Sequence, residues 1–468
     1  MSPTTPKKRV IEIKPAIDVD AKVYPRSVKG RFQRWRWVFV GLTQLIFYGL
    51  CWLPWNGRPA VLFDLDARRF YLFDLVLWPQ DTIYLAVLLA LSALALFLFT
   101  AVAGRLWCGY TCPQTVYTEL FLWLEKRVEG DRPKRMKLDA APWSIGKLLV
   151  KATKHALWLA LALWTGFSFV GYFTPVRELM DGVAHLALGP WEIFWVFFYG
   201  AATYGNAGFL REHMCKYICP YAQFQFVMFD RDTLNITYDR ERGDPRGSRP
   251  KMADPRASGL GDCIDCSICV QVCPTGIDIR DGLQLECIGC AACIDACNQV
   301  MDKMNYPRGL IRYSTENAVA TGASRREVVR RAFRPRVLLY LAVFVAVAGT
   351  TAWSLATKVP LKISVLRDRS AMSREAADGS IENTFTLHLT NASEQARSYR
   401  VQVDGLPGLR LATAPDITVP AAAIGERTIV LRVDPGAAAA GAHAIRIRVE
   451  DQADSAIAAS ETARFWMP

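Results

Sequence analysis

Long apolar stretches alternate with polar loops along the first three quarters of the chain. Five stretches contain no Asp, Glu, Lys or Arg, and they cover residues 37–57, 82–104, 155–176, 193–210 and 337–357. Each is close to the length of about 20 residues that crosses a bilayer, and tryptophans lie near several of the ends. The pattern predicts five transmembrane helices, with a buried or re-entrant helix as the alternative for the fourth.

Basic residues orient these predicted helices. Residues 1–35 carry nine Lys and Arg and residues 105–154 carry ten, whereas residues 58–81 carry three and residues 177–192 carry one. Because basic loops stay on the cytoplasmic side of a membrane, the N-terminus is predicted to be cytoplasmic. The first span has no small-residue cleavage site, so we interpret it as an uncleaved anchor.

The C-terminal part of the chain alternates apolar and polar residues instead. Such alternation, with turn residues between the segments, is typical of strands in a β-sandwich of about 100 residues. The segments are 361–367, 381–390, 397–405, 426–433 and 442–450. We predict an all-β, Ig-like sandwich that binds a partner or forms a structural cap.

Composition supports a membrane protein with large soluble parts. Hydrophobic residues make up 51% of the 468 residues and charged residues only 21%, which disfavours disorder and an ordinary soluble enzyme. The net charge of +12 is assigned to the cytoplasmic flanks of the spans and not to nucleic-acid binding.

Thirteen cysteines, all between Cys51 and Cys297, carry the candidate chemistry. A secreted disulfide framework would not confine its cysteines in this way. Eight of them form two runs with the C-x2-C-x2-C-x3-C spacing of bacterial two-cluster ferredoxins, in which the fourth cysteine of each run binds the other cluster. We predict one 4Fe–4S cluster on Cys263, Cys266, Cys269 and Cys297, and a second on Cys273, Cys287, Cys290 and Cys293. Two zinc sites are the competing interpretation, which the doubled spacing and Pro274 disfavour.

Two C-x3-C-P motifs follow the second and fourth spans. They contain Cys108 and Cys112 before Pro113, and Cys215 and Cys219 before Pro220. Proline breaks a helix before it and suits the first turn of a new one, so Cys112 and Cys219 are predicted at helix N-termini, where the dipole favours a thiolate. A shared metal site, such as one for Cu(I), and a redox-active dithiol both stay open.

For the remaining cysteine and the histidines, the sequence indicates no definite metal or haem site. Cys51 is interpreted as a packing residue, and His213, two residues before Cys215, is either a further metal ligand or a surface residue. Only His155 begins a span, and no C-x-x-C-H motif occurs, so no haem is expected.

These patterns predict a multi-domain membrane protein, an α-helical bundle of five transmembrane helices with a two-cluster ferredoxin-like segment and a C-terminal sandwich. The predicted parts are a cytoplasmic N-terminal segment (1–36), a four-span membrane domain (37–210), a cytoplasmic domain (211–336) with the ferredoxin segment at about 255–300, a fifth transmembrane helix (337–357) and a periplasmic sandwich (358–468).

The sequence resembles the CcoG/FixG/RdxA family, accessory proteins of cbb(3)-type cytochrome c oxidase. The stretches that carry the resemblance are WNGRPAVLFDLDARRFYLF (55–73), LWCGYTCPQTVYTE (106–119), KLDAAPW (137–143), REHMCKYICPYAQFQ (211–225), the ferredoxin segment (261–301) and GLIRY (309–313). They are spread over most of the chain. The departures are His213, where the family pattern has Gln, and Asn298, where it has Asp.

The resemblance implies a protein of a Gram-negative inner membrane with two 4Fe–4S clusters, which reduces Cu(II) to Cu(I) for the oxidase. The cysteines of the C-x3-C-P motifs would then be the copper or redox pairs. Expected partners are an unidentified cytoplasmic electron donor and either oxidase subunits or copper chaperones and transporters. The sequence leaves open whether the protein forms a homodimer. The alternatives are a quinol-linked electron-transfer subunit of a periplasmic reductase, and a non-enzymatic scaffold for oxidase assembly.

Overall fold

The computed structural model describes residues 22–251, 259–368 and 372–468. The first 21 residues of the predicted N-terminal segment, and residues 255–258 of the predicted ferredoxin segment, lie outside this part. The chain forms two units. Unit 1 takes in Met1–Gly41, Phe99–Leu161 and Thr203–Phe333, and unit 2 takes in Leu42–Leu98, Ala162–Ala202 and Arg334–Pro468.

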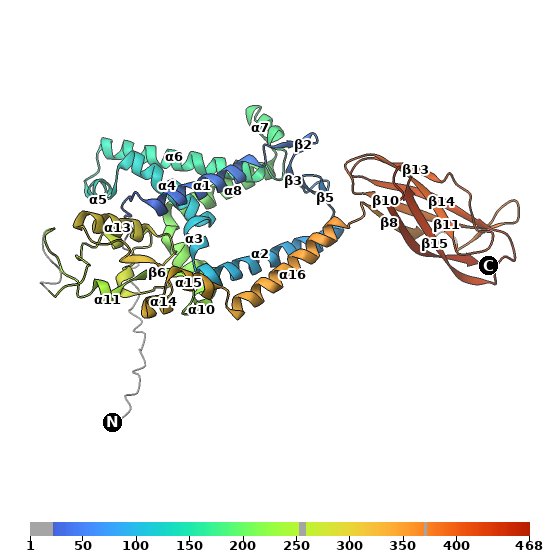
Figure 1. Cartoon of the computed structure of the whole chain (residues 1–468). Coiled ribbons are helices and arrows are strands. Elements are labelled where there is room, and N and C mark those ends of the chain that lie inside the picture. Colours follow the sequence, from blue (N-terminus) through green and yellow to red (C-terminus); the bar gives the residue numbers. More distant parts are fainter. Residues whose placement is uncertain (1–21, 252–258, 369–371) are drawn as a thin grey trace, which may run out of the picture. The chain divides into compact units, whose positions relative to one another are not determined.

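Helices dominate the chain before residue 357 (Figure 1). The α-helices are α1 Arg31–Gly49, α2 Thr82–Ala103, α3 Leu106–Tyr110, α4 Pro113–Glu129, α5 Arg132–Ala140, α6 Ile145–Val170, α7 Val176–Ala184, α8 Pro190–Gly205, α9 Arg211–His213, α10 Pro220–Met228, α11 Arg240–Gly243, α12 Ile268–Val272, α13 Ala292–Met304, α14 Glu316–Thr321, α15 Arg325–Ala332 and α16 Pro335–Ala356. Two π-helical segments, η2 Asn206–Leu210 and η3 Met214–Ile218, flank α9, and the 3-10 turns are η1 Pro79–Asp81 and η4 Ile279–Asp281.

Each predicted span overlaps mainly one α-helix, namely α1, α2, α6, α8 and α16, and the end of the fourth span forms η2. Among the described residues, two helices are long and apolar enough to cross a membrane, Pro79–Ala103 and Pro335–Ala356. They correspond to α2 and α16, which run side by side (Figure 1), with the Tyr84 and Ser354 hydroxyls 2.9 Å apart. The five-helix bundle stays a prediction.

Helix α1 is offset from the predicted span 37–57. It begins at Arg31, because the carboxylate of Asp295 accepts the backbone N–H groups of Phe32 and Gln33 at 3.3 and 2.8 Å and so satisfies the first turn. It ends at Gly49, and the chain then turns into the short strands β1 Pro54–Trp55 and β2 Arg58–Pro59. The last residues of the predicted span are therefore not helical.

Residues 58–81, predicted only as a loop, contain a small antiparallel sheet. Its strands are β3 Val61–Asp64, β4 Arg69–Leu72 and β5 Leu75–Leu77, in the order β3-β4-β5. The strands are three or four residues long, which is too short for a convincing alternation of apolar and polar positions.

The ferredoxin segment folds around the packed helices α12 and α13. The strands β6 Asn235–Tyr238 and β7 Ile311–Ser314 pair antiparallel, with Asn235 opposite Ser314. Their buried residues Ile236 and Ile311 share one hydrophobic core with Met301 of α13. This core brings both cysteine runs into one domain within unit 1.

The C-terminal residues form the predicted β-sandwich. One sheet has the order β12-β14-β10-β8, with β9 also paired to β10, and the other has the order β13-β11-β15-β16. The strands are β8 Leu361–Arg367, β9 Arg374–Glu375, β10 Ile381–Asn391, β11 Arg397–Asp404, β12 Arg410–Leu411, β13 Asp416–Val419, β14 Ile424–Val433, β15 Gly441–Asp451 and β16 Ala458–Met467. The inward residues of both sheets form one core, in which Phe385, Tyr399 and Phe465 are almost fully buried.

Candidate metal centres

The two ferredoxin-like cysteine runs share an unusual backbone. In each run, the residue before the second cysteine and the residue after it are left-handed: Asp265 and Ser267 in the first run, Gly289 and Ala291 in the second. Left-handed non-glycine residues are uncommon and gather at functional sites. Helices α12 and α13 then begin directly after Ser267 and Ala291. The two cysteine runs, which share the same spacing, therefore also share the same backbone conformation.

The first cavity brings together the four cysteines predicted for one cluster. Cys263, Cys266, Cys269 and Cys297 line it, and its other walls are mainly apolar side chains such as Ile311. The thiol of Cys297 also lies within electrostatic range of the other three. The fourth cysteine of the second run has therefore joined the first three of the first run.

The second cavity has the reciprocal set. Cys273, Cys287, Cys290 and Cys293 line it together with Cys269 and with apolar residues such as Ile236, Ile277 and Ile288. The two cavities are largely apolar and share Cys269, and their cysteines fit two 4Fe–4S clusters, because thiolates are the ligands of these clusters. Which cysteines bind which cluster stays a prediction.

Burial controls the protonation of two of these thiols. Desolvation raises the pKa of Cys287 and of Cys297 to about 12, and neighbouring thiols add to the rise. Without a metal these two thiols are therefore protonated at neutral pH, and cluster loading releases their protons. Across the described part of the chain, no three His, Cys, Asp or Glu side chains form a single-ion site.

The four cysteines of the C-x3-C-P motifs converge in unit 1. The Cys215 thiol is within electrostatic range of Cys112, Cys108 and Cys219, and the Cys112 thiol is within range of Cys219. The two motifs are about 100 residues apart in the sequence, and the fold makes them one group of thiols. We call these four side chains the four-thiol group.

The predicted helix starts are confirmed, but the predicted thiolate is not. Cys112 is the N-cap of α4 and Cys219 the N-cap of α10, each followed by proline in the first turn. Desolvation nevertheless raises the pKa of Cys112, although the backbone N–H groups of Gln114 and Thr115 favour its charged form. Burial likewise raises the pKa of Cys108 to about 11 and of Cys215 to about 12. Desolvation here outweighs the helix dipole.

The second motif lies on widened, π-helical backbone. Cys215 belongs to η3, and η2 precedes it, with Arg211 at a φ of 34° between them. The side chain of Gln114, two residues after Cys112, donates to the carbonyls of Asn206 and Arg211 at 3.0 and 3.1 Å. The Asn206 carbonyl also accepts the backbone N–H of Arg211, so the Gln114 amide adds a second donor there and links the first motif to the π-helical segments around the second.

Arg105 connects the four-thiol group to the second cavity. Its guanidinium is buried and donates to the carbonyls of Leu285 and Ala222. Leu285 precedes Cys287, and Ala222 follows Cys219. The same cation is within electrostatic range of Cys108, Cys287, Cys215 and Cys219, so it stabilises negative charge at both places.

Two glycines let the first C-x3-C-P motif and the second cysteine run approach each other closely. A Cβ added at Gly109 would lie 2.8 Å from the backbone of Gly289 and Cys290, and one added at Gly289 would lie 2.9 Å from the carbonyl of Arg105. In addition, Cys108 and Cys215 pack against the core that contains Cys290. The four-thiol group and the second cavity are therefore direct neighbours.

Replacing Gly109 by alanine is expected to lower stability by about 1–3 kcal/mol, because backbone atoms must move to admit the methyl group. The measurement is the apparent melting temperature of the cluster-loaded protein. Gly146→Ala is the matched control, since nothing lies within 4 Å of its added Cβ. Equal melting temperatures for the two variants would contradict the close approach.

Other candidates are placed as follows. Cys51 is fully buried among apolar residues that include Phe167, as predicted for a packing residue. His213 lies 4.0 Å from Glu212 and packs against Tyr217. Gln225, which was not predicted as a site residue, is buried and accepts a hydrogen bond from the Cys108 thiol at 3.3 Å. No spacing signal marks it, because its partner is 117 residues away.

Three regions match known families. Residues 210–316 match a family described as a 4Fe–4S dicluster domain, and residues 85–130 match one described as a 4Fe–4S binding domain. Residues 351–468 match a family described as an IG-like fold at the C-terminal of FixG. The chain is therefore an iron–sulfur electron-transfer protein with ferredoxin-type domains and a C-terminal Ig-like domain.

Whole-chain relatives identify the family. The nitrogen fixation protein FixG of Rhizobium meliloti is 38% identical over 86% of this chain and 83% of its own length. Protein RdxB and Protein RdxA of Cereibacter sphaeroides are 40% and 39% identical, each over 92% of this chain and 93% of its own length. The chain belongs to the FixG/RdxA family. The crystal structure of a FixG-related protein from Vibrio parahaemolyticus matches 23% of this chain and 95% of that chain, with 25% identity and a TM-score of 0.21.

Proposed function

We propose that this protein is a membrane-bound cupric reductase, which binds copper at the four-thiol group and converts Cu(II) to Cu(I). The observation that carries the proposal is the convergence of Cys108, Cys112, Cys215 and Cys219 beside the second ferredoxin cavity. A one-electron carrier and a set of soft ligands are thereby neighbours. When bound, the two clusters supply the single electrons that the reduction of Cu(II) to Cu(I) consumes.

The residues of the four-thiol group suit the product of this reaction. Thiolates are soft ligands and favour Cu(I) over Cu(II). Copper binding displaces thiol protons, and the buried Arg105 offsets part of the negative charge that remains. Before copper binds, Gln225 holds the Cys108 thiol in place by accepting a hydrogen bond from it. The four thiols lie within electrostatic range of one another, and copper binding would draw them onto one ion, because in the described residues no three of them are already placed to hold one.

The proposed setting follows the predicted topology. The cysteines would lie on the cytoplasmic side of the inner membrane, where thiols stay reduced, and the sandwich would lie in the periplasm. Cu(I) would then be handed to the assembly of a cbb(3)-type oxidase, directly or through copper chaperones and transporters. The electron donor would be a cytoplasmic reductant.

A second candidate for the four-thiol group is a further iron–sulfur cluster. One observation favours it: the match to a 4Fe–4S binding domain at residues 85–130 contains Cys108 and Cys112. The group would then extend the relay and reduce a substrate elsewhere. The two candidates differ in metal content.

Iron analysis of the anaerobically purified protein is expected to give about eight irons per chain, four for each of two clusters. Replacing all four cysteines of the group by serine is expected to leave that value unchanged, since copper is their proposed ligand. A value of about twelve that falls to about eight in the variant would instead establish a third cluster. Copper titration of both proteins, monitored by bound Cu(I), completes the comparison.

A further inference from the structure

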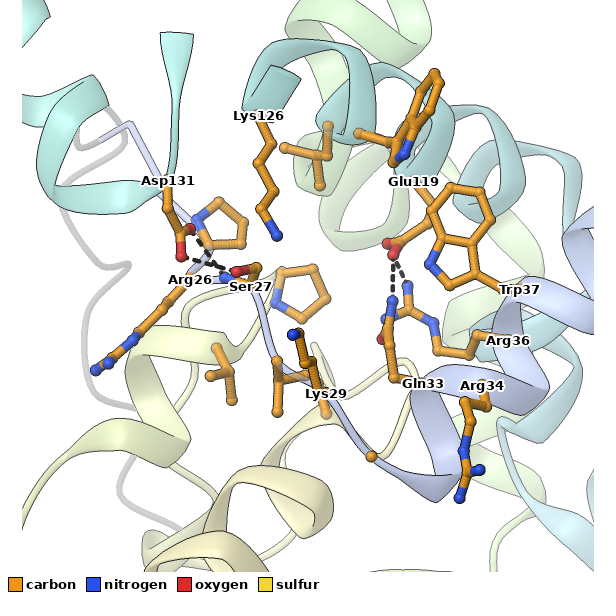
Figure 2. A pocket seen from close by; sticks show the side chains of 18 of the residues that line it. Arg26, Ser27, Lys29, Gln33, Arg34, Arg36, Trp37, Glu119, Lys126 and Asp131 are labelled. Carbon is orange, nitrogen blue, oxygen red and sulfur yellow. Dashed lines mark hydrogen bonds and ion pairs between the residues drawn. The ribbon is translucent and has the colours of Figure 1, made fainter. Parts of the chain in front are cut away.

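A large cavity of unit 1 lies outside the metal centres. It has a volume of about 900 Å³ and is bordered by the segment before α1, by α1, α4 and α5, and by residues of the two cysteine runs. Figure 2 shows it from close by. Val272, Pro274 and Ala292, which neighbour cluster cysteines in the sequence, form part of its wall.

The two acidic side chains that line this cavity, Glu119 and Asp131, already accept hydrogen bonds from other residues of the cavity. Glu119 accepts from the Arg36 guanidinium at 2.7 Å and from the Gln33 amide at 2.6 Å. Asp131 accepts from the hydroxyl and the backbone N–H of Ser27, at 2.7 and 3.0 Å. Glu119 is therefore paired with Arg36, whereas Asp131 accepts only from neutral groups and lies within electrostatic range of Lys126. The lining still holds more cations than carboxylates.

Two lysines supply that additional positive charge. The side chains of Lys29 and Lys126 come from opposite walls, and their ammonium groups point into the space between them (Figure 2). Within the described ranges, neither ammonium group has an ion pair. Arg26 and Arg34 add two more cations to the lining. An excess of cations around a cavity attracts an anion.

The other side of the cavity is apolar. Trp37 of α1 and Trp123 of α4 meet edge to face with their ring centres 6.3 Å apart, and Leu122 and Val38 complete this wall. Tryptophan is enriched where protein crosses the membrane–water interface. The cavity thus combines a cationic end with an aromatic, apolar end.

An exposed apolar stripe on α1 borders the cavity. Trp35 and Val38 lie three residues apart on one helix face and are 50% and 55% exposed. A free phosphate ion would use the lysines and leave this stripe unexplained. An anion that carries acyl chains would use both.

We propose that this cavity binds the phosphate headgroup of an anionic phospholipid. Lys29 and Lys126 hold the phosphate, Trp37 and Trp123 lie at the level of the interface, and the acyl chains follow the stripe on α1. Since residues next to cluster cysteines share the wall, the bound lipid fixes the ferredoxin segment against the membrane surface. This site does not depend on copper chemistry.

The test uses the full-length protein, purified in detergent and freed of lipid, with phosphatidylglycerol and phosphatidylcholine as probes in native mass spectrometry. We expect tighter binding of phosphatidylglycerol, and a loss of about tenfold or more in its affinity for a Lys29→Ala/Lys126→Ala variant. Lys303→Ala, an exposed lysine of α13 outside the cavity, is the control and should bind as the unmodified protein does. The iron–sulfur absorption spectrum verifies that each variant is folded.

Three results would overturn the proposal. One is equal binding of the two lipids by the unmodified protein, which needs no variant. Another is unchanged phosphatidylglycerol binding in the folded double variant. The third is displacement of the lipid by inorganic phosphate at equal concentration, which would assign the lysines to free phosphate.

Discussion

Replacing Cys108, Cys112, Cys215 and Cys219 together by serine is expected to reduce Cu(II) reduction to the rate of a protein-free blank. Serine hydroxyls are hard ligands that do not favour Cu(I), so the product loses its binding site. The eight cysteines of the ferredoxin cavities are untouched, and the EPR signals of both reduced clusters should persist. The measurement is the anaerobic formation of a coloured Cu(I) chelate by the reduced protein.

The matched control is Cys51→Ser, which removes a thiol that belongs to an apolar core of unit 2. This variant should keep its reductase activity, so that loss of activity cannot be ascribed to thiol loss in general. Full Cu(II) reduction by the four-serine variant, with both clusters present, would contradict the assignment of the site.

Pairs of serine substitutions are expected to distinguish which cysteines share a cluster. Cys273→Ser with Cys287→Ser removes two ligands of the same predicted cluster, and should leave about four irons per chain. Cys273→Ser with Cys266→Ser removes one ligand from each cluster, and should leave almost none. Iron analysis and EPR of the anaerobically purified variants measure both outcomes.

An arrangement in which each run of four cysteines held its own cluster would reverse the two results. Cys273 and Cys266 would then belong together, and that pair of substitutions would spare one cluster. The two variants carry equal numbers of substitutions, so the comparison does not depend on how much each one destabilises the domain.

Local patterns made the grouping of the cysteines around two cavities and most of the sandwich predictable. The C-x2-C-x2-C-x3-C spacing places three thiols around one centre through short-range geometry alone, and the cavities contain the predicted sets. Likewise, β8 covers the predicted residues 361–367, because apolar and polar residues alternate there. Pro113 and Pro220 correctly predicted where α4 and α10 begin.

Other elements carry weaker local patterns. The strand β16, Ala458–Met467, was not predicted, since alanine occupies two of its inward positions, 459 and 463, and makes the alternation faint. The sheet β3-β4-β5 was missed because its strands are very short. A pattern must contrast large apolar with polar residues over several positions before it indicates a strand.

Long-range contacts account for the rest of the site. The contact between Arg105 and Leu285 joins residues 180 positions apart, and the contact between Cys108 and Gln225 joins residues 117 positions apart. Spacing within a motif carries no information about such partners. The same is true of burial, which raises the pKa of Cys112 where the helix dipole alone predicts a thiolate.

The most direct test of the central claim is a single-turnover experiment on the unmodified protein. The anaerobically reduced, cluster-loaded protein is mixed with Cu(II), and the Cu(II) and cluster EPR signals are recorded in the same samples over time. We predict that the Cu(II) signal disappears as the clusters become oxidised, with about two Cu(II) reduced per chain, one for each cluster. A Cu(II) signal that persists beside fully reduced clusters would contradict the account.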